Sequence, residues 1–202
     1  MAQTSFFRDK DVLDLIVTHV IPVVSTFRDI RIWDAGCASG EEPYSLAMLF
    51  AEKLNPFSFR SVYIDATDRE ESNFPQFERI IQSGQYDKSS VMWVPEDLRA
   101  KYFSPLAGSD CFEIIPELKS RITFTRHDLT SLQMLREDYC LIVCKNTLMH
   151  ITPESQSEIV PMFHRSLRDP GFLALDIFQK LPPGTEHLFQ KVTETGNLFK
   201  KI

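Results

Sequence analysis

Several features of membrane and nucleic-acid-binding proteins are missing from this sequence. No run approaches the roughly 20 apolar residues of a membrane helix, and the start, M-A-Q-T-S-F-F-R-D, lacks the basic and apolar segments of a signal peptide. The formal net charge is −6, and the longest basic run is only Lys200-Lys201, so the sequence has no cluster of cations for phosphate binding. We therefore expect a cytoplasmic protein that neither inserts into a membrane nor binds nucleic acid.

Cysteine and glycine are scarce as well. The chain has four cysteines and no C-x-x-C pair, which argues against a zinc site, and unpaired thiols suit a reducing compartment. It has seven glycines, which nowhere form the G-x-G-x-x-G fingerprint of dinucleotide binding. No internal repeat or low-complexity segment is present. With 202 residues and an ordinary apolar content, the chain is long enough for one domain with a substantial core.

The most informative stretch covers residues 30–54. It begins with a short apolar run, continues through the small residues of 34–40, and resumes at Glu41 as a pattern of apolar residues three and four apart. This order predicts a strand, a tight loop and a helix, as in doubly wound α/β folds, where small loop residues let a ligand approach the backbone. Glu41 and Glu42 would repel a pyrophosphate, so the loop fits a cationic ligand without phosphate, such as S-adenosylmethionine. An ordinary turn without a ligand is the alternative.

Weaker patterns predict the other elements. Strands are expected at 60–67, 121–127, 138–145 and 172–177, helices at 9–27, 70–83 and 153–167, and a hairpin at 188–192 and 197–202. The stretch 85–120 has the weakest pattern, with a short helix at 96–102 and a strand at 111–115.

Polar residues follow two of these strands at the edge where ligands of open α/β sheets bind. Asp68 comes just past the second strand, roughly thirty residues after the loop, where a carboxylate can accept from both ribose hydroxyls. Asp65 competes for this role, but strand alternation would direct its side chain elsewhere. Asn146 and Thr147 follow the strand at 138–145 in the same way.

Five motifs along the chain resemble those of one enzyme family. They are T-S-F-F-R-D at 4–9, A-G-C-A-S-G-E-E-P-Y-S-L-A at 35–47, A-T-D at 66–68, I-T-F-T-R-H-D-L at 122–129 and L-I-V-C-K-N-T-L-M-H at 141–150. In this order they resemble the CheR-type methyltransferases, which methylate glutamates of chemotaxis receptors. The resemblance implies an α/β, Rossmann-like class I methyltransferase fold. Its sheet would be mostly parallel, with helices on both faces, a C-terminal antiparallel hairpin and a small subdomain inserted at about 85–120, all within one domain over 1–202.

The resemblance also implies S-adenosylmethionine as the cofactor and a set of site residues. The residues expected to contact the cofactor are Thr4, Arg8, Ala35, Gly36, Glu42, Asp68, Asp128, Leu129, Asn146 and Thr147. Asp128 stands where the family often has asparagine next to the adenine, and it can also accept a hydrogen bond. Arg8 and His150 are the expected catalytic residues, and Arg8 would hold an acceptor carboxylate. From the sequence alone, Arg8 could instead be an ordinary surface charge.

His150 stands where family members usually have tyrosine. It would act as a base if the acceptor were a phenol or an amine, or it would only pack and hydrogen-bond.

The expected activity is methyl transfer to a glutamate of a protein substrate such as a methyl-accepting chemotaxis receptor. Three departures from the family keep alternatives open. Asp176-Ile-Phe-Gln179 replaces G-H-S-E, Ser104-Pro-Leu-Ala-Gly-Ser-Asp110 replaces the glycine-rich turn of members that dock a receptor tail, and the family's N-terminal helical domain is expected to be absent. The alternatives are another acceptor, either protein or small molecule, and a cofactor-binding signalling module without catalysis.

Overall fold

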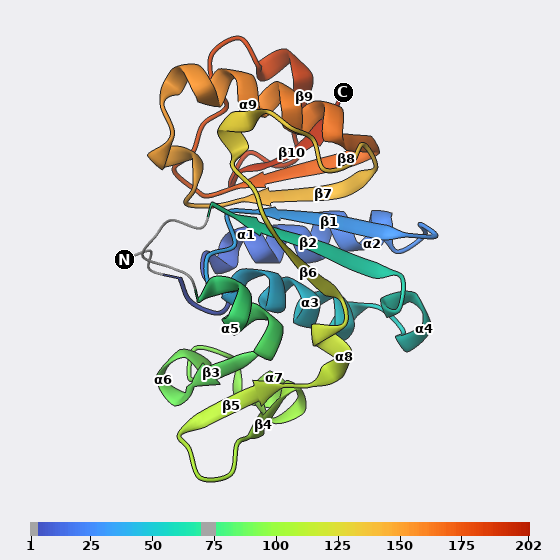
Figure 1. The fold of residues 1–202 in the computed structure, drawn as a ribbon. Coiled ribbons are helices and arrows are strands. Elements are labelled where there is room, and N and C mark those ends of the chain that lie inside the picture. The colour runs from blue at the N-terminus through green and yellow to red at the C-terminus, as the bar shows by residue number, and fades with distance from the viewer. Residues whose placement is uncertain (1–3, 70–75) are drawn as a thin grey trace.

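The computed structural model describes residues 4–69 and 76–202, and its centre is a seven-stranded sheet (Figure 1). The strand order is β6-β2-β1-β7-β8-β10-β9. The strands are β1 (Ile30–Ala35), β2 (Val62–Asp68), β6 (Ile122–Arg126), β7 (Tyr139–Cys144), β8 (Leu167–Leu175), β9 (Phe189–Lys191) and β10 (Leu198–Lys201). The first five run parallel, whereas β10 is antiparallel to both β8 and β9. This arrangement confirms the predicted mostly parallel sheet with its closing hairpin.

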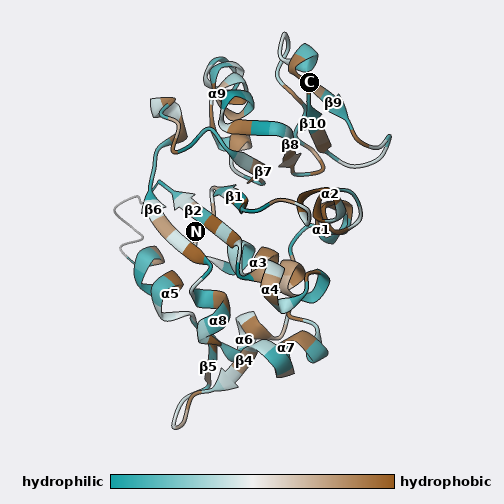
Figure 2. Cartoon of the chain, turned by 90° about the vertical axis from the view of Figure 1, so that its right-hand side faces the viewer, coloured by the Kyte–Doolittle hydropathy of each residue, from teal (hydrophilic) through white to brown (hydrophobic). Residues whose placement is uncertain are grey.

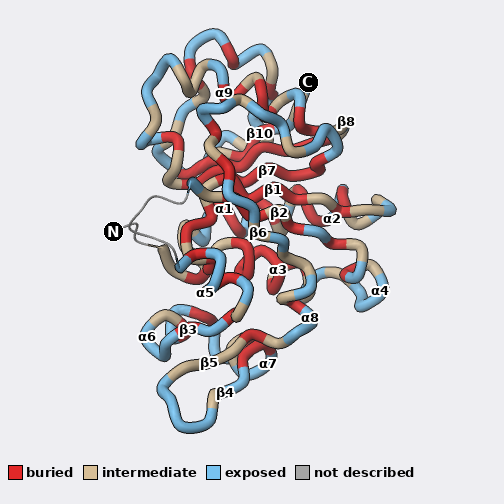
Figure 3. The backbone as a smooth tube through the Cα atoms, in the orientation of Figure 1, coloured by how far each residue is buried: buried red, intermediate tan, exposed pale blue. Residues whose placement is uncertain are grey.

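Strands β1 and β7 occupy the middle of the sheet because their sequences are apolar on both faces. All six residues of β7 and five of the six in β1 are buried, as expected for parallel strands covered on two sides (Figure 3). The strand order reverses between these two strands, since β1 has β2 on one side and β7 on the other. Ligands of open α/β sheets bind outside the carboxyl ends of the strands at such a reversal.

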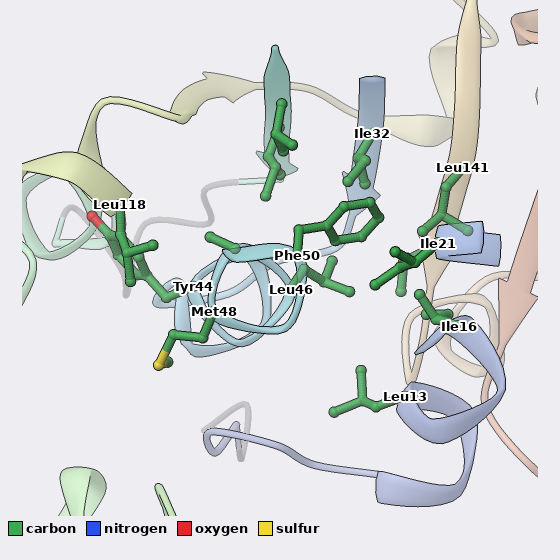
Figure 4. Packing of buried hydrophobic residues seen from close by; sticks show 14 of the residues in the cluster. Leu13, Ile16, Ile21, Ile32, Tyr44, Leu46, Met48, Phe50, Leu118 and Leu141 are labelled. Atoms are coloured by element: carbon green, nitrogen blue, oxygen red, sulfur yellow. The ribbon is translucent and has the colours of Figure 1, made fainter. Parts of the chain in front are cut away.

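Helices cover both faces of the sheet, as predicted. One face packs against a helical segment made of α1 (Lys10–Leu15), a π-helical turn η1 (Ile16–Val20) and α2 (Ile21–Val24), and against α3 (Glu41–Lys53). In Figure 4, Leu13, Ile16 and Ile21 of this segment lie on the same side of the sheet as Phe50 of α3 and Leu141 of β7. The opposite face packs against α9 (Pro153–Ser166), whose surface shows both hydrophobic and hydrophilic residues in Figure 2.

The first helical segment differs from the helix expected at 9–27, in which Pro22 was predicted to introduce a late bend. Pro22 has no N–H to donate, and its ring would clash with the carbonyl four residues earlier in a regular helix. The chain widens into the π turn just before it, where the N–H of Ile21 donates to the carbonyl of Ile16. The proline thus changes the hydrogen-bond register without ending the helix.

The weakly patterned stretch forms the predicted small subdomain at the lower end of Figure 1. It holds a three-stranded antiparallel sheet of β3 (Gln85–Asp87), β5 (Cys111–Ile114) and β4 (Phe103–Pro105), together with α6 (Lys88–Val91) and α7 (Glu96–Tyr102). The ring of Phe6 packs edge-on against Tyr86 and Phe103, with ring centroids 4.9 and 5.5 Å apart. These contacts tie the subdomain to the segment that precedes α1.

The remaining boundaries differ by a few residues. Of the helix predicted at 70–83, α5 (Phe77–Ser83) is described, and residues 70–75 lie outside the described residues. Strand β8 ends at Leu175, so Asp176 and Ile177 lie beyond it, and α4 (Pro56–Phe59) and α8 (Pro116–Lys119) are short helices that precede β2 and β6. Within 4–69 and 76–202, no helix has the length and apolar character needed to cross a membrane.

Candidate functional site

A cavity of about 790 Å³ lies where the sheet's strand order reverses, and its volume is within the usual range for ligand sites. Its walls are residues that follow the carboxyl ends of β1, β2, β6 and β7, together with residues of the segment before α1. Every residue predicted for the site lines it except Ala35. The predicted residues in the wall are Thr4, Arg8, Gly36, Glu42, Asp68, Asp128, Leu129, Asn146, Thr147 and His150. Ala35 is still part of β1, and its side chain is fully buried in the core beneath α9.

The loop after β1 is shaped by glycine. The N–H groups of Gly36 and Cys37 both donate to the carbonyl of Thr67, at 2.8 and 3.0 Å, which bends the chain across the end of β2. Gly36 has a φ of +113°, and a Cβ added there would lie only 1.9 Å from Oγ1 of Thr147. A side chain at this position would therefore collide with the residue that follows β7. Glycine lets the two cavity walls approach each other.

Asp68 is the last residue of β2 and lines the cavity, whereas Asp65 lies outside the cavity wall. The N–H of Ala38 donates to Oδ2 of Asp68 at 2.8 Å, so the carboxylate fixes the loop while it lines the cavity. An ionised carboxylate has about four acceptor positions, which leaves capacity for hydroxyl donors of a ligand. Asp65 instead accepts from the hydroxyl of Tyr139 at 2.7 Å and from Nε of Arg136 at 3.2 Å.

Asp128 is a second acceptor in the cavity wall. Its Oδ1 accepts from the hydroxyl and the N–H of Thr130, at 2.7 and 2.9 Å, and its Oδ2 lies 3.6 Å from Nε of Arg69. The hydrogen bonds from Thr130 lower the pKa of Asp128, with a smaller effect from Arg69. The group is therefore ionised at neutral pH. Leu129 turns inward and is buried against the core.

Two further carboxylates are largely buried, which makes their charge costly: Glu42 lines the cavity, and Asp34 lies within β1. Asp34, the fifth residue of β1, is 1% exposed, and neither of its oxygens has a hydrogen-bond partner among the described residues. Burial raises the pKa of Asp34 well above its usual value, and the nearby charge of Glu42 raises it further. Burial also raises the pKa of Glu42, whereas Lys145 opposes that shift. Glu42 is paired with the ammonium of Lys145 at 3.0 Å and also lines the cavity, where the positive charge of a ligand would stabilise its ionised form.

The chemistry of the wall therefore fits S-adenosylmethionine. Its sulfonium and ammonium groups are cations, its ribose offers two hydroxyl donors, and it carries no phosphate. Asp68 and Asp128 supply acceptors in the cavity wall, and Glu42 adds a largely buried carboxylate. No group of three histidine, cysteine, aspartate or glutamate side chains that could hold a metal occurs within 4–69 and 76–202.

Comparison with known families decides the family of the chain. A family model described as the SAM-binding domain of CheR methyltransferase matches residues 2–197. The chain belongs to the CheR methyltransferase family. The cofactor of this CheR domain is S-adenosylmethionine, and the predicted fold class of a Rossmann-like methyltransferase is confirmed.

Individual relatives cover this CheR domain to different extents. It is 33% identical over 172 residues to a chemotaxis protein methyltransferase of Listeria innocua. These residues make up 84% of this chain and 62% of that protein. It is 32% identical over 178 residues to an uncharacterized 104.1 kDa protein of Rhodobacter capsulatus, covering 85% of the chain and 18% of that protein. The chain thus spans less than two thirds of either relative. A SAM-dependent methyltransferase of Methanosarcina mazei is a similar solved structure, with a TM-score of 0.43 and 16% identity over 90% of this chain and 76% of that one.

The CheR cavity also contains a buried lysine that the sequence did not single out. Lys145 follows β7 directly, and its side chain is 1% exposed. Its Nζ donates to the carbonyl of Arg8 at 2.7 Å and to Oε2 of Glu42 at 3.0 Å. Lysine side chains are usually exposed, so the residue type alone gave no reason to expect Lys145 to be buried. The signal available was its place inside the motif C-K-N-T, next to Asn146.

Asp176 is a second residue whose role only the structure reveals. It lies just beyond β8 and is buried, and its Oδ2 accepts from the N–H of Asn146 at 3.1 Å. Its Oδ1 accepts from the N–H groups of Phe178 and Gln179, both at 3.0 Å. Asn146 itself has a φ of +55°, an unusual conformation that this contact supports. Asp176 therefore fixes the backbone that presents Asn146 to the cavity.

The rim of the CheR cavity carries His150 and Met149. Both are exposed while they line the cavity, and they belong to a short 3₁₀ turn, Leu148–His150. The side-chain amide of Gln156 donates to the carbonyls of Leu148 and Ile151, each at 2.9 Å. Helix α9 thus holds this turn, and His150 is available to a ligand or an acceptor at the cavity mouth.

Proposed function

We propose that this CheR domain transfers the methyl group of S-adenosylmethionine to a glutamate carboxylate of a protein. One observation carries the proposal beyond the family match: Arg8, a cation suited to an acceptor carboxylate, lines the same cavity as Asp68 and Glu42. The relatives named chemotaxis protein methyltransferase suggest a chemotaxis receptor as the protein. Since all four cysteines are free thiols and three of them are buried, we place the reaction in the reducing cytoplasm.

The residues of the cavity have little bond chemistry to perform. S-adenosylmethionine, when bound, supplies the methyl group on a sulfonium that is already a good leaving group. A glutamate acceptor has a reference pKa of about 4.3, so it is ionised at neutral pH and needs no general base. Arg8 would hold that carboxylate by charge-assisted hydrogen bonds, and the walls would orient it for in-line attack. Held geometry of this kind can lower a barrier by about 7–11 kcal/mol.

The surroundings of the cavity support a protein acceptor rather than a small molecule. Met149 at the rim is 62% exposed, and Phe178, which is hydrogen-bonded to the same aspartate as Asn146, is 84% exposed. We assign these two exposed apolar side chains to the surface that the protein acceptor would contact.

A different acceptor is the second candidate, and His150 is the observation that favours it. An imidazole exposed at the cavity mouth could take the proton of a phenol or an amine. Replacing His150 with phenylalanine separates the two. Glutamate methylation should persist within a few-fold, whereas transfer to a phenol or an amine should fall by about 10²–10⁴-fold.

The direct test uses the purified protein, methyl-labelled S-adenosylmethionine and receptor cytoplasmic fragments. Label should enter the fragment, should be released as methanol by mild alkali, and should be lost when the acceptor glutamates are changed to glutamine. Alkali release identifies a carboxyl ester, because methylamines and phenol ethers survive it. Tight cofactor binding with no labelled product from any protein or small acceptor would reject methyl transfer and leave a signalling module.

A further inference from the structure

We infer that Lys145 is a positioning residue for Arg8, which it fixes through the backbone of the arm, residues 4–9. The inference rests on the proposed function, because it assigns Lys145 a part in the reaction through Arg8. It predicts that the two residues act as one unit, although 137 positions separate them in the chain.

The contacts of Lys145 join the end of β7 to two other segments, the arm and α3. Its ammonium lies 2.7 Å from the carbonyl oxygen of Arg8, 3.0 Å from Oε2 of Glu42 in the first turn of α3, and 3.8 Å from Oδ2 of Asp9. An ammonium has three donors and is costly to bury without acceptors. Here the arm and α3 provide them, so Lys145 is satisfied within the protein. It is therefore suited to fixing the arm rather than to holding the acceptor itself.

The arm needs such a contact because its conformation is unfavourable on its own. Phe7 and Asp9, on either side of Arg8, both have a φ of +55°, a region that residues other than glycine rarely adopt. The arm has two anchors around Arg8. The N–H of Phe7 donates to the hydroxyl of Ser45 at 2.9 Å, and the carbonyl of Arg8 accepts from Lys145. These anchors hold the peptide group that precedes Phe7 and the one that follows Arg8, which restricts the direction in which the side chain of Arg8 leaves the backbone.

The chain offers a matched control for the loss of a lysine. Lys119 also combines a carboxylate partner, Glu113, with a backbone carbonyl, that of Ser83 at 3.2 Å. It is partly buried and belongs to α8, outside the cavity wall. Lys119→Met therefore removes a similar set of contacts without touching the arm.

The test compares Lys145→Met, Lys145→Arg, Lys119→Met and Arg8→Ala, each checked by thermal unfolding. Hydrogen exchange of a peptide spanning the arm should speed up in Lys145→Met and stay unchanged in Lys119→Met. The kcat for methyl transfer should fall by about 10²-fold in Lys145→Met, as expected for a misplaced reacting group, while the Kd for S-adenosylhomocysteine changes only a few-fold. Lys145→Arg should restore protection of the arm and part of the rate.

The double variant Arg8→Ala/Lys145→Met gives the decisive comparison. If Lys145 acts through Arg8, the double variant is no slower than Arg8→Ala alone. Three results would overturn the inference. The rate losses of the two single variants could multiply in the double variant, hydrogen exchange of the arm could stay unchanged in Lys145→Met, or the Kd for S-adenosylhomocysteine could rise as much as kcat falls. The exchange and Kd measurements need no turnover. If the wild type transferred no methyl group, the proposed function would fail. The exchange and Kd measurements would still test whether Lys145 holds the arm. If Lys145→Met did not fold, Lys145→Arg would decide the question by the same measurements.

Discussion

Replacing Asp68 with asparagine should weaken cofactor binding strongly without disturbing the fold. The amide oxygen of the new side chain could still accept the N–H of Ala38, which now lies 2.8 Å from Oδ2 of Asp68, so the loop keeps its anchor. The other oxygen becomes an amide NH₂, which repels a hydroxyl donor, and the negative charge is lost. A hydrogen bond to a charged group contributes about 1.5–3 kcal/mol. The Kd for S-adenosylmethionine should therefore rise by about 10- to 150-fold.

Calorimetric titration with S-adenosylmethionine and S-adenosylhomocysteine measures this effect, and Asp65→Asn is the matched control. Asp65 is on the same strand three residues earlier, and it bonds to Tyr139 and Arg136 outside the cavity wall. Its replacement should reduce the free energy of unfolding and leave the Kd within about two-fold. An Asp68→Asn protein that folds normally and binds with an unchanged Kd would refute the assignment of Asp68 to the ribose.

Three further substitutions test the structure around the site. Gly36→Ala should lower the free energy of unfolding by more than the ~1–3 kcal/mol of backbone strain, because the new methyl group meets Thr147, and urea denaturation measures it. Asp34→Asn should stabilise the protein increasingly as pH rises from 4 to 8. Burial raises the folded pKa of Asp34. Its contribution to stability is therefore most favourable below the unfolded pKa of about 3.9 and falls, as pH rises towards the folded pKa, by ~1.4 kcal/mol for each unit of that elevation, whereas asparagine has no proton to lose. Unfolding titrations at several pH values check the sign, and a difference that shrinks with pH would contradict it. Phe163→Ala should cost about 3–5 kcal/mol, since its fully buried ring packs edge-on against Trp33, and unchanged stability would contradict the packing.

The sequence was sufficient for the parts of the fold that local pattern determines. Apolar runs located the strands of the parallel sheet, and the small residues before Glu41 located the loop that bends across β2. Pro22 shows the limit of such reasoning, because a proline inside a helical pattern predicts a bend, whereas the tertiary structure accommodates it with a π turn. The strand predicted to reach Ile177 ended at Leu175 because Asp176 turns inward to bind backbone N–H groups.

The site divides in the same way. Alternation along β2 predicted different directions for Asp68 and Asp65, and Asp68 lines the cavity whereas Asp65 bonds to Tyr139 outside it. Lys145 and Asp176 were missed because their roles come from partners 137 and 30 residues away, and no local pattern encodes such pairings. Ala35 was assigned to the cavity from its motif, although its side chain still follows the strand into the core.

The bond between Lys145 and Arg8 also bears on the order in which the molecule is made. During synthesis the arm leaves the ribosome before its anchor Lys145, which follows β7 and comes 137 residues after Arg8. Until then the arm has its contact with Ser45 and the packing of Phe6 against Tyr86 and Phe103, but its two left-handed residues lack the bond to Lys145. The cavity wall therefore closes only after most of the sheet has been translated. A nascent chain stopped before residue 145 would contain the glycine loop and Asp68 but would lack a fixed Arg8.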